Sequence, residues 1–207
     1  MTNYSSSLIE TAVNELARLP GIGKKTALRL VLHLLKRPVS ESENLGNAII
    51  QLRRDIQFCS RCYNVSDNLI CTICNNPLRN KKTICVVENI RDVIAIERTN
   101  QYQGVYHVLG GVISPMDGIG PELLKIDALL KRINEDGVEE IIMALNPTMD
   151  GDTTIFYISQ KIEHLNIKLT TLARGVAFGG DLEYVDELTL ARSLATRTNY
   201  ENYLIKE

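Results

Sequence analysis

Four cysteines lie within sixteen residues of this 207-residue chain, as Cys59-x2-Cys62 and Cys71-x2-Cys74 with eight residues between the two pairs. The stretch is rich in Asn, Ser and Asp, and it has too few large apolar residues to build a core of its own. Each pair can hold a metal ion from one side, and the loop can bring both pairs together as a tetrahedral thiolate site suited to zinc. The spacing therefore predicts a small metal-stabilised module at residues 57–79.

The predicted zinc ion is structural, because four cysteine ligands leave no coordination position open for a water molecule. Disulfides are the weaker alternative, since the polar start MTNYSSS lacks the basic and apolar regions of a secretion signal. No window of the sequence approaches the roughly 18 uninterrupted apolar residues of a membrane span. We expect a cytoplasmic protein with no membrane partner.

The residues before the cysteines predict an all-α domain at 1–56. Apolar residues at helical spacing indicate two helices separated by Pro20-Gly21, the second ending before Pro38. Ser40 and Glu43 have the spacing of a capping box, which predicts a third helix running to about Phe58.

The turn between the first two helices is suited to binding phosphate. Gly21 and Gly23 permit a tight turn, and the amide groups and dipole of the following helix favour an anion. Lys24, Lys25 and Arg29 add positive charge. The arrangement resembles the helix-hairpin-helix motif, which grips the sugar-phosphate backbone of single- or double-stranded DNA without reading bases. The alternative is an αα-hairpin with a glycine turn and solvated lysines.

From Lys81 onward, short β-branched runs alternate with helix-length segments, which is typical of a parallel sheet covered on both faces. We expect this α/β domain at 80–175, with Cys85 buried on its first strand. A glycine-containing loop and a helix then follow at 176–207. The fold class is thus multidomain α/β, with a helical front, a zinc module, a parallel-sheet domain and a short helical C-terminal segment.

Polar residues gather where the predicted strands end, which is where parallel sheets place their ligands. Glu88 ends the first strand, Asn146 ends the third, and Thr148, Asp150 and Asp152 follow in the loop or first helical turn. The pattern resembles the Toprim domain of topoisomerases and primases, which holds Mg2+ with a glutamate after the first strand and an Asp-x-Asp after the third. Glu88 matches the glutamate, but Asn146 and Thr148 replace the two aspartates.

Replacing two anionic ligands by neutral groups disfavours a two-metal phosphoryl-transfer site, because Mg2+ is held through carboxylates and water. Weak residual Mg2+ binding by Glu88, Asp150 and Asp152 stays open. So do two other roles for the two aspartates: capping the following helix, or forming an acidic docking patch for a basic partner.

Charge is unevenly distributed along the chain. Residues 1–82 carry 12 Lys/Arg and 6 Asp/Glu, a net charge of +6, whereas the remainder carries 11 and 19, a net charge of −8. The front therefore favours a polyanion, and the back favours carboxylate chemistry or a protein partner. Ordinary solvated faces are the alternative.

The order of these motifs, together with GGVISPMDGIGPELL and NPTMDGD, resembles the RecR family of bacterial recombination mediators over essentially the full length. The resemblance implies a nucleoid-associated homotetrameric ring that clamps DNA. It also implies work with RecO, and in some cases RecF, to load RecA on single strands coated by single-strand-binding protein. The role of Arg174 stays undecided between DNA, an acidic neighbour and a ring partner.

Three functions therefore compete. The leading one is a non-enzymatic DNA-binding mediator in recombinational repair. The second is a Mg2+-dependent Toprim nuclease or topoisomerase, against which Asn146 and Thr148 speak. The third is a structural ring that binds protein partners and whose basic charge is incidental.

Overall fold

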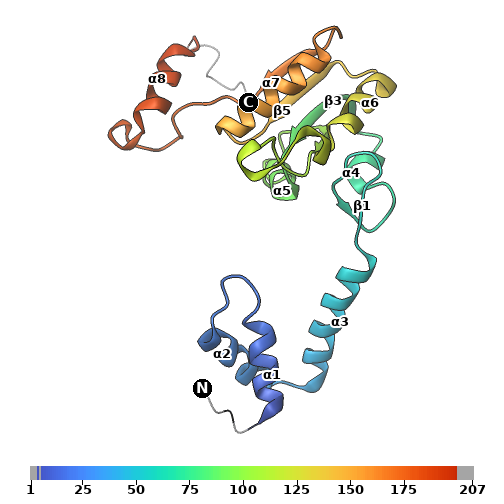
Figure 1. Cartoon of the computed structure of the whole chain (residues 1–207), viewed down its shortest axis with the longest axis vertical. Helices are drawn as coiled ribbons and strands as arrows, with labels where there is room; N and C mark the ends of the chain where they lie inside the picture. The colour runs from blue at the N-terminus through green and yellow to red at the C-terminus, as the bar shows by residue number, and fades with distance from the viewer. Residues whose placement is uncertain (1–3, 5, 200–207) are drawn as a thin grey trace. The chain divides into compact units, whose positions relative to one another are not determined.

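The computed structural model describes residue 4 and residues 6–199. The chain divides into two compact units, Met1–Ile56 and Gln57–Glu207. Figure 1 shows a helical first unit and a second unit built around a sheet.

The first unit consists of α1 (Ser7–Leu16), α2 (Lys24–Leu34) and α3 (Val39–Asp55). Val13 of α1 and Ala27 and Val31 of α2 form its buried core. The apolar spacing thus predicted the α1–α2 hairpin correctly, because its period places these side chains on facing sides of two helices.

The expected capping box is wrong. α3 begins at Val39 after an N-cap at Pro38, and no side chain caps it, so Ser40 lies inside the helix. Proline is tolerated at a helix start because its missing N–H would have no partner there. The helix also ends at Asp55 rather than near Phe58, since Gln57 already begins a strand.

The second unit opens with the cysteine module, defined here as residues 57–79. It contains the antiparallel pair β1 (Gln57–Phe58) and β2 (Val65–Ser66), followed by the short helix α4 (Thr72–Asn75). These elements are too short to bury much apolar surface, as the composition indicated.

A four-stranded sheet follows, in the order β4-β3-β5-β6, with every neighbouring pair parallel. Its strands are β3 (Asn80–Val87), β4 (Gly104–Val108), β5 (Glu140–Ala144) and β6 (Lys168–Thr171). The buried Cys85 lies between Tyr106 and Ile142 in register, as expected for an apolar position on the first strand. The predicted parallel α/β domain is confirmed.

Helices cover both faces of this sheet (Figure 1). α6 (Ile126–Asp136) and α7 (Met149–Ile162) pack against one face, in a core that includes Ile84 and Val86. α5 (Ile90–Glu97) packs against the other face, beside Cys85 and Val87. Successive residues of β3 thus point to opposite layers, as the pleat requires.

Short 3-10 helices connect the larger elements. η1 (Pro115–Asp117) and η2 (Pro121–Leu123) lie between β4 and α6, and Gly120 is the N-cap of η2. η3 (Leu182–Tyr184) and α8 (Glu187–Ala195) belong to the C-terminal arm, defined here as residues 172–199. Within the described ranges, none of the helices has the length and apolar character needed to span a membrane.

Candidate functional site

The four cysteines of the module converge on one point. All four side chains are buried, and their Sγ atoms lie within 4.8 Å of one another. A tetrahedral zinc ion bound at about 2.3 Å to each sulfur would hold the sulfurs roughly 3.8 Å apart, so the cluster fits this ion. Cys59, Cys62, Cys71 and Cys74 can therefore hold a structural metal such as zinc.

Backbone geometry prepares these sulfurs for a cation. The Cys71 amide donates to Cys59 Sγ at 3.3 Å, and the Cys74 amide donates to Cys71 Sγ at 3.4 Å, where Cys71 caps α4. Hydrogen bonding from Cys62 lowers the pKa of Cys71, whereas the same contact raises the pKa of Cys62. One thiolate is thus stabilised by its neighbours, and a bound cation would favour that charged form in all four.

The module is fixed to the sheet by polar contacts as well as by packing. The Val108 amide at the end of β4 donates to the Cys62 carbonyl at 2.8 Å. Asp136 accepts from Arg61 of the module at 2.5 Å and from the buried Arg132 of α6 at 3.2 Å. These contacts therefore hold the cysteine module against β4 and α6.

At the carboxyl end of the sheet, Glu88 and Asn146 meet. β3 ends at Val87 and β5 at Ala144, and these adjacent strands bring the two side chains together. Asn146 Nδ2 donates to Glu88 Oε2 at 2.8 Å. The position where the Toprim pattern has an aspartate thus supplies a hydrogen-bond donor to the glutamate, instead of a second metal-binding carboxylate.

Thr148 has a structural contact of its own. It is the N-cap of α7, where its Oγ1 accepts from the Gly151 amide at 3.1 Å. A Cβ on Gly151 would lie 2.1 Å from the Asn146 carbonyl oxygen, so only glycine allows this turn to close. Thr148, rather than Asp150 or Asp152, performs the capping that we had considered for the two aspartates.

Asp152 is engaged by Arg174, which donates two hydrogen bonds, at 2.6 and 3.1 Å. The Arg174 guanidinium lowers the pKa of Asp152. Asp150, in the same helical turn, is half-buried. Over residues 4 and 6–199, the four cysteines are the one group of three or more His, Cys, Asp or Glu side chains that lie close enough together to hold a metal ion. The acidic residues at the end of the sheet, all within these described ranges, form no such group.

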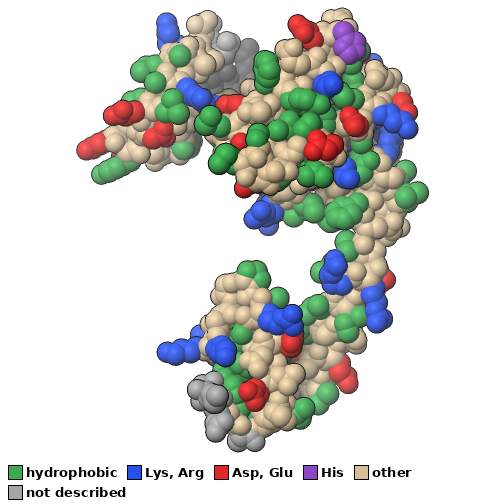
Figure 2. Space-filling model, in the orientation of Figure 1, with side chains coloured by type: hydrophobic (Ala, Val, Ile, Leu, Met, Phe, Trp, Pro, Cys, Tyr) green, Lys and Arg blue, Asp and Glu red, His purple; other side chains and the backbone are tan. Residues whose placement is uncertain are grey.

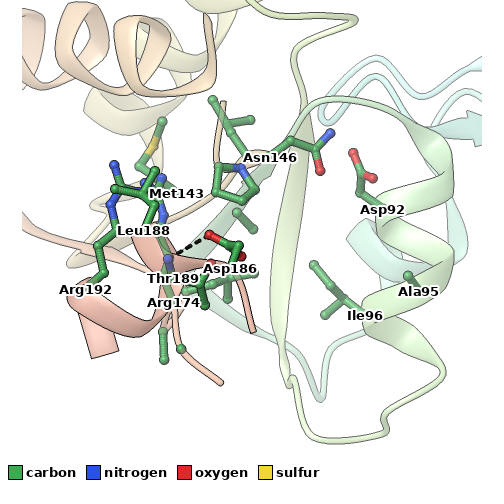
Figure 3. Close-up of a pocket in the computed structure, with 16 residues that line it drawn as sticks. Asp92, Ala95, Ile96, Met143, Asn146, Arg174, Asp186, Leu188, Thr189 and Arg192 are labelled. Carbon is green, nitrogen blue, oxygen red and sulfur yellow. Dashed lines mark hydrogen bonds between the residues drawn. The ribbon is translucent and has the colours of Figure 1, made fainter. Parts of the chain in front are cut away.

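A hollow of about 610 Å³ lies between this edge of the sheet, α5 and the C-terminal arm. Figure 3 shows Asp92 and Asn146 on one side of it and Leu188 and Arg192 of α8 on the other. Asp186 caps α8 by accepting from the Thr189 amide at 2.9 Å. The hollow is the crevice that an open parallel sheet offers at its carboxyl ends.

The helix-hairpin-helix turn has an open approach. Gly21 adopts φ +80, and Gly23 is the N-cap of α2 without a side-chain acceptor for the helix amides. A Cβ at either glycine would meet nothing within 4 Å. Lys24 and Lys25 form the start of α2, and Lys25 and Arg29 line one shallow hollow on that helix. Figure 2 shows Lys and Arg side chains exposed on this helical unit.

Family models match three segments of the chain, and curated relatives match nearly all of it. Residues 9–53 match the model described as RecR, helix-hairpin-helix, and residues 82–173 match the Toprim domain. The protein named Recombination protein RecR of Cytophaga hutchinsonii is 56 % identical over 200 residues, covering 96 % of this chain and 98 % of that protein. The chain belongs to the RecR family.

Other RecR relatives agree. Recombination protein RecR of Bacteroides thetaiotaomicron is 56 % identical over 195 residues, covering 94 % of this chain and 95 % of that protein. That of Porphyromonas gingivalis strain ATCC 33277 is 52 % identical over 199 residues, covering 96 % of each. Residues 175–198 match the model described as RecR, C-terminal. The resemblance drawn from the motifs is thereby confirmed, and so is the four-part fold.

Sequence reasoning missed several contacts that shape these sites. It left an acidic neighbour of Arg174 as one of three alternatives, and the structure identifies that neighbour as Asp152. It did not find the bridge through Asp136 or the cap supplied by Thr148. Arg61 and Asp136 are 75 residues apart in the chain, so no local pattern could have paired them.

Proposed function

We propose that this RecR-family protein is a non-catalytic DNA-binding mediator of recombinational repair. The observation that carries the proposal is the open helix-hairpin-helix turn, whose α2 amides have no side-chain cap. Helix N-termini with unpaired amides bind phosphate, and Lys24, Lys25 and Arg29 add charge beside them. Since phosphate contacts carry no sequence information, binding is independent of sequence on both single and double strands.

The lack of catalysis is part of the proposal. At the two Toprim aspartate positions, Asn146 donates a hydrogen bond to Glu88 and Thr148 caps α7. Asp152 is paired with Arg174. A Mg2+ site here would have to break these contacts and would gain fewer carboxylates than the Toprim pattern supplies. Zn2+ in the cysteine cluster is structural, and any Mg2+ at Glu88, Asp150 and Asp152 binds weakly.

Assembly into a homotetrameric ring is also proposed. α3 buries none of its residues, and it exposes a set of large apolar side chains that a second copy could cover: Val39, Leu45, Ile49, Ile50 and Leu52. The C-terminal arm exposes Phe178 and Tyr184 in the same way and is assigned to contacts between subunits. Ile49→Glu is expected to lower the mass in sedimentation, whereas Leu78→Glu, also on an exposed side chain, leaves it unchanged.

In cells the ring would act with RecO, and in some cases RecF, to help load RecA on single-stranded DNA in the bacterial cytoplasm. The working division is 1–56 for DNA, 57–79 for zinc, 80–175 for the Toprim domain and 176–207 for subunit contact. The acidic residues of the Toprim domain are the candidate docking site for a basic partner.

Binding and chemistry can be tested together. Wild type and Lys24→Glu/Lys25→Glu are incubated with supercoiled plasmid and single-stranded DNA, with and without Mg2+ or Mn2+. We expect wild type to retard intact DNA, and the double variant to bind unrelated sequences equally poorly. Arg53→Glu/Arg54→Glu, with the same charge change in the same unit, is the control and should bind far better than the Lys24/Lys25 variant. Unchanged affinity of the Lys24/Lys25 variant at low salt contradicts the DNA site. Metal-dependent nicking that disappears in Glu88→Gln favours the nuclease or topoisomerase instead.

A further inference from the structure

A second hollow, of about 540 Å³, lies where the cysteine module meets the carboxyl end of the sheet. Phe58 and Tyr63 line it from the module, and Ile90 and Val108 line it from α5 and β4. Its polar lining comes from Asn89, Lys125 and the backbone at Gly110. An apolar hollow with a few polar groups at its edge is the usual form of a site for a small-molecule ligand or a fragment of a larger one.

Of the two aromatic side chains in this hollow, Tyr63 is held in place by its neighbours. Tyr63 has φ +61, a conformation that non-glycine residues rarely adopt and that costs energy unless the surroundings fix it. Its amide donates to the Cys59 carbonyl at 3.0 Å, and its ring packs edge-on against His107 at 5.6 Å between centroids. Phe58 is 65 % exposed although it lies directly beside Cys59. The module thus presents one ring that its contacts hold in place, Tyr63, and one exposed ring, Phe58.

The polar groups are donors. Lys125 Nζ lies 5.5 Å from the Tyr63 ring centroid, and no carboxylate of the described residues pairs with it. Asn89 uses Oδ1 to accept from the Arg91 amide, so its Nδ2 points to no partner within residues 4 and 6–199. Of the residues that the structure describes, no carboxylate lines the hollow. It therefore offers aromatic faces, an ammonium group and an amide donor.

We propose that this hollow binds an unstacked nucleobase of single-stranded DNA, with the neighbouring phosphate on Lys125. A base has a flat π face for Phe58 and Tyr63 and acceptors on its edge for Asn89. The inference rests on the proposed DNA-binding function and deepens it, because the helix-hairpin-helix turn holds backbone only. The hollow would give this protein a preference for single strands, whose bases are free to leave the stack.

An apolar peptide side chain is the competing occupant, and the lining favours it less. A peptide would use the apolar wall but would bring backbone N–H groups to a rim that supplies donors from side chains. A nucleotide brings one negative charge and several acceptors, which complement the unpaired ammonium group and the free amide.

Affinity for three DNA probes tests the assignment: an oligothymidylate, an abasic oligomer of the same length and charge, and a duplex. We expect Phe58→Ala to weaken binding of the oligothymidylate about 5- to 150-fold, the range for losing one aromatic–base stack, and to leave the other two probes unchanged. Leu69→Ala, on a side chain of equal exposure (66 %) in the same module, is the control and should bind like wild type. Lys125→Gln should lower the salt dependence of single-strand binding by about 0.7 in log–log slope.

Photocrosslinking gives a readout independent of affinity. A single strand carrying 5-iododeoxyuridine should crosslink to Tyr63 or Phe58, mapped by mass spectrometry, and the same base within a duplex should not. The base site is overturned if Phe58→Ala loses the same affinity for the abasic oligomer as for the oligothymidylate. It is also overturned if Phe58→Ala binds with wild-type affinity and the crosslinks are confined to α2. If Lys24→Glu/Lys25→Glu still weakens every probe in that case, the DNA-binding function stands and only the hollow is reassigned, in favour of a peptide. If wild type binds no probe, the proposed function itself fails.

Discussion

Replacing Thr154 by valine should destabilise the sheet unit, although it changes neither shape nor burial. Thr154 is fully buried in α7, and its Oγ1 accepts from the Ile113 amide at 2.8 Å while donating to the Asp150 carbonyl at 2.7 Å. Valine keeps the volume but offers no acceptor, so a buried N–H loses its partner. An unsatisfied buried donor costs about 1–3 kcal/mol.

The neighbouring residue supplies a matched control. Thr153 makes the same helical contact, donating to the Met149 carbonyl at 2.8 Å, but it is exposed and receives no hydrogen bond from the Ile113 loop. Thr153→Val should change the free energy of unfolding by less than about 0.5 kcal/mol. The difference between the two variants isolates the acceptor, because both lose one hydroxyl donor from α7.

Calorimetry and hydrogen exchange measure this difference. For a unit of this size, about 1–3 kcal/mol corresponds to a Tm roughly 2–12 °C lower. The Ile113 amide should also exchange faster in Thr154→Val than in wild type, since the loop after β4 loses its attachment to α7. Equal Tm values for both variants, with the Ile113 amide still protected in Thr154→Val, would refute this account of the loop.

Three further predictions concern other parts of the second unit. Burial lowers the pKa of His107 to about 4, below its ordinary value near 6.5. The free energy of unfolding should therefore be unaffected by this group above pH 6.5 and should fall by about 3 kcal/mol as the pH falls towards 4. Urea titrations at several pH values should show this pH dependence reduced in His107→Phe and unchanged in the control His164→Gln. Gly151→Ala should lower the Tm despite the better helix propensity of alanine, because its Cβ would collide with the Asn146 carbonyl; a raised Tm would show that the turn relaxes freely. Cys71→Ser should reduce zinc to well below one equivalent per chain in elemental analysis, with the amide signals of the module collapsing in NMR spectra; full zinc content would show that three sulfurs suffice.

Much of the fold could be predicted from the sequence because it depends on local patterns. Helical and β-branched periodicities predicted the α1–α2 hairpin and the parallel sheet, and the Cys-x2-Cys spacing predicted the cluster of four cysteines. Each of these patterns is formed by residues that are close together in the sequence. The start of α3 was misjudged for the same reason. Ser40 and Glu43 have the local spacing of a cap, but the N-cap is Pro38, two residues earlier, and the helix begins at Val39.

The candidate site could be predicted only in part, because its contacts join segments that are distant in the sequence. Glu88 and Asn146 could be brought together by reasoning about strand ends, and the structure places them in contact. The Arg174 partner and the hollow beside Tyr63 depend on how the C-terminal arm and the cysteine module fold back on the sheet. No periodicity in the sequence predicts such contacts, so these pairs of residues could be identified only from the three-dimensional structure.

The contact between the cysteine module and β4 has a consequence for solubility. β4 is an edge strand, yet all five of its residues are buried, and two of its backbone groups are occupied: the Val108 amide by Cys62 and the Tyr106 carbonyl by Arg132. Exposed strand edges recruit strands from other molecules and start aggregation. The cysteine module and α6 therefore cover part of this edge. We expect unfolding of the module to expose β4 and to favour self-association through this strand.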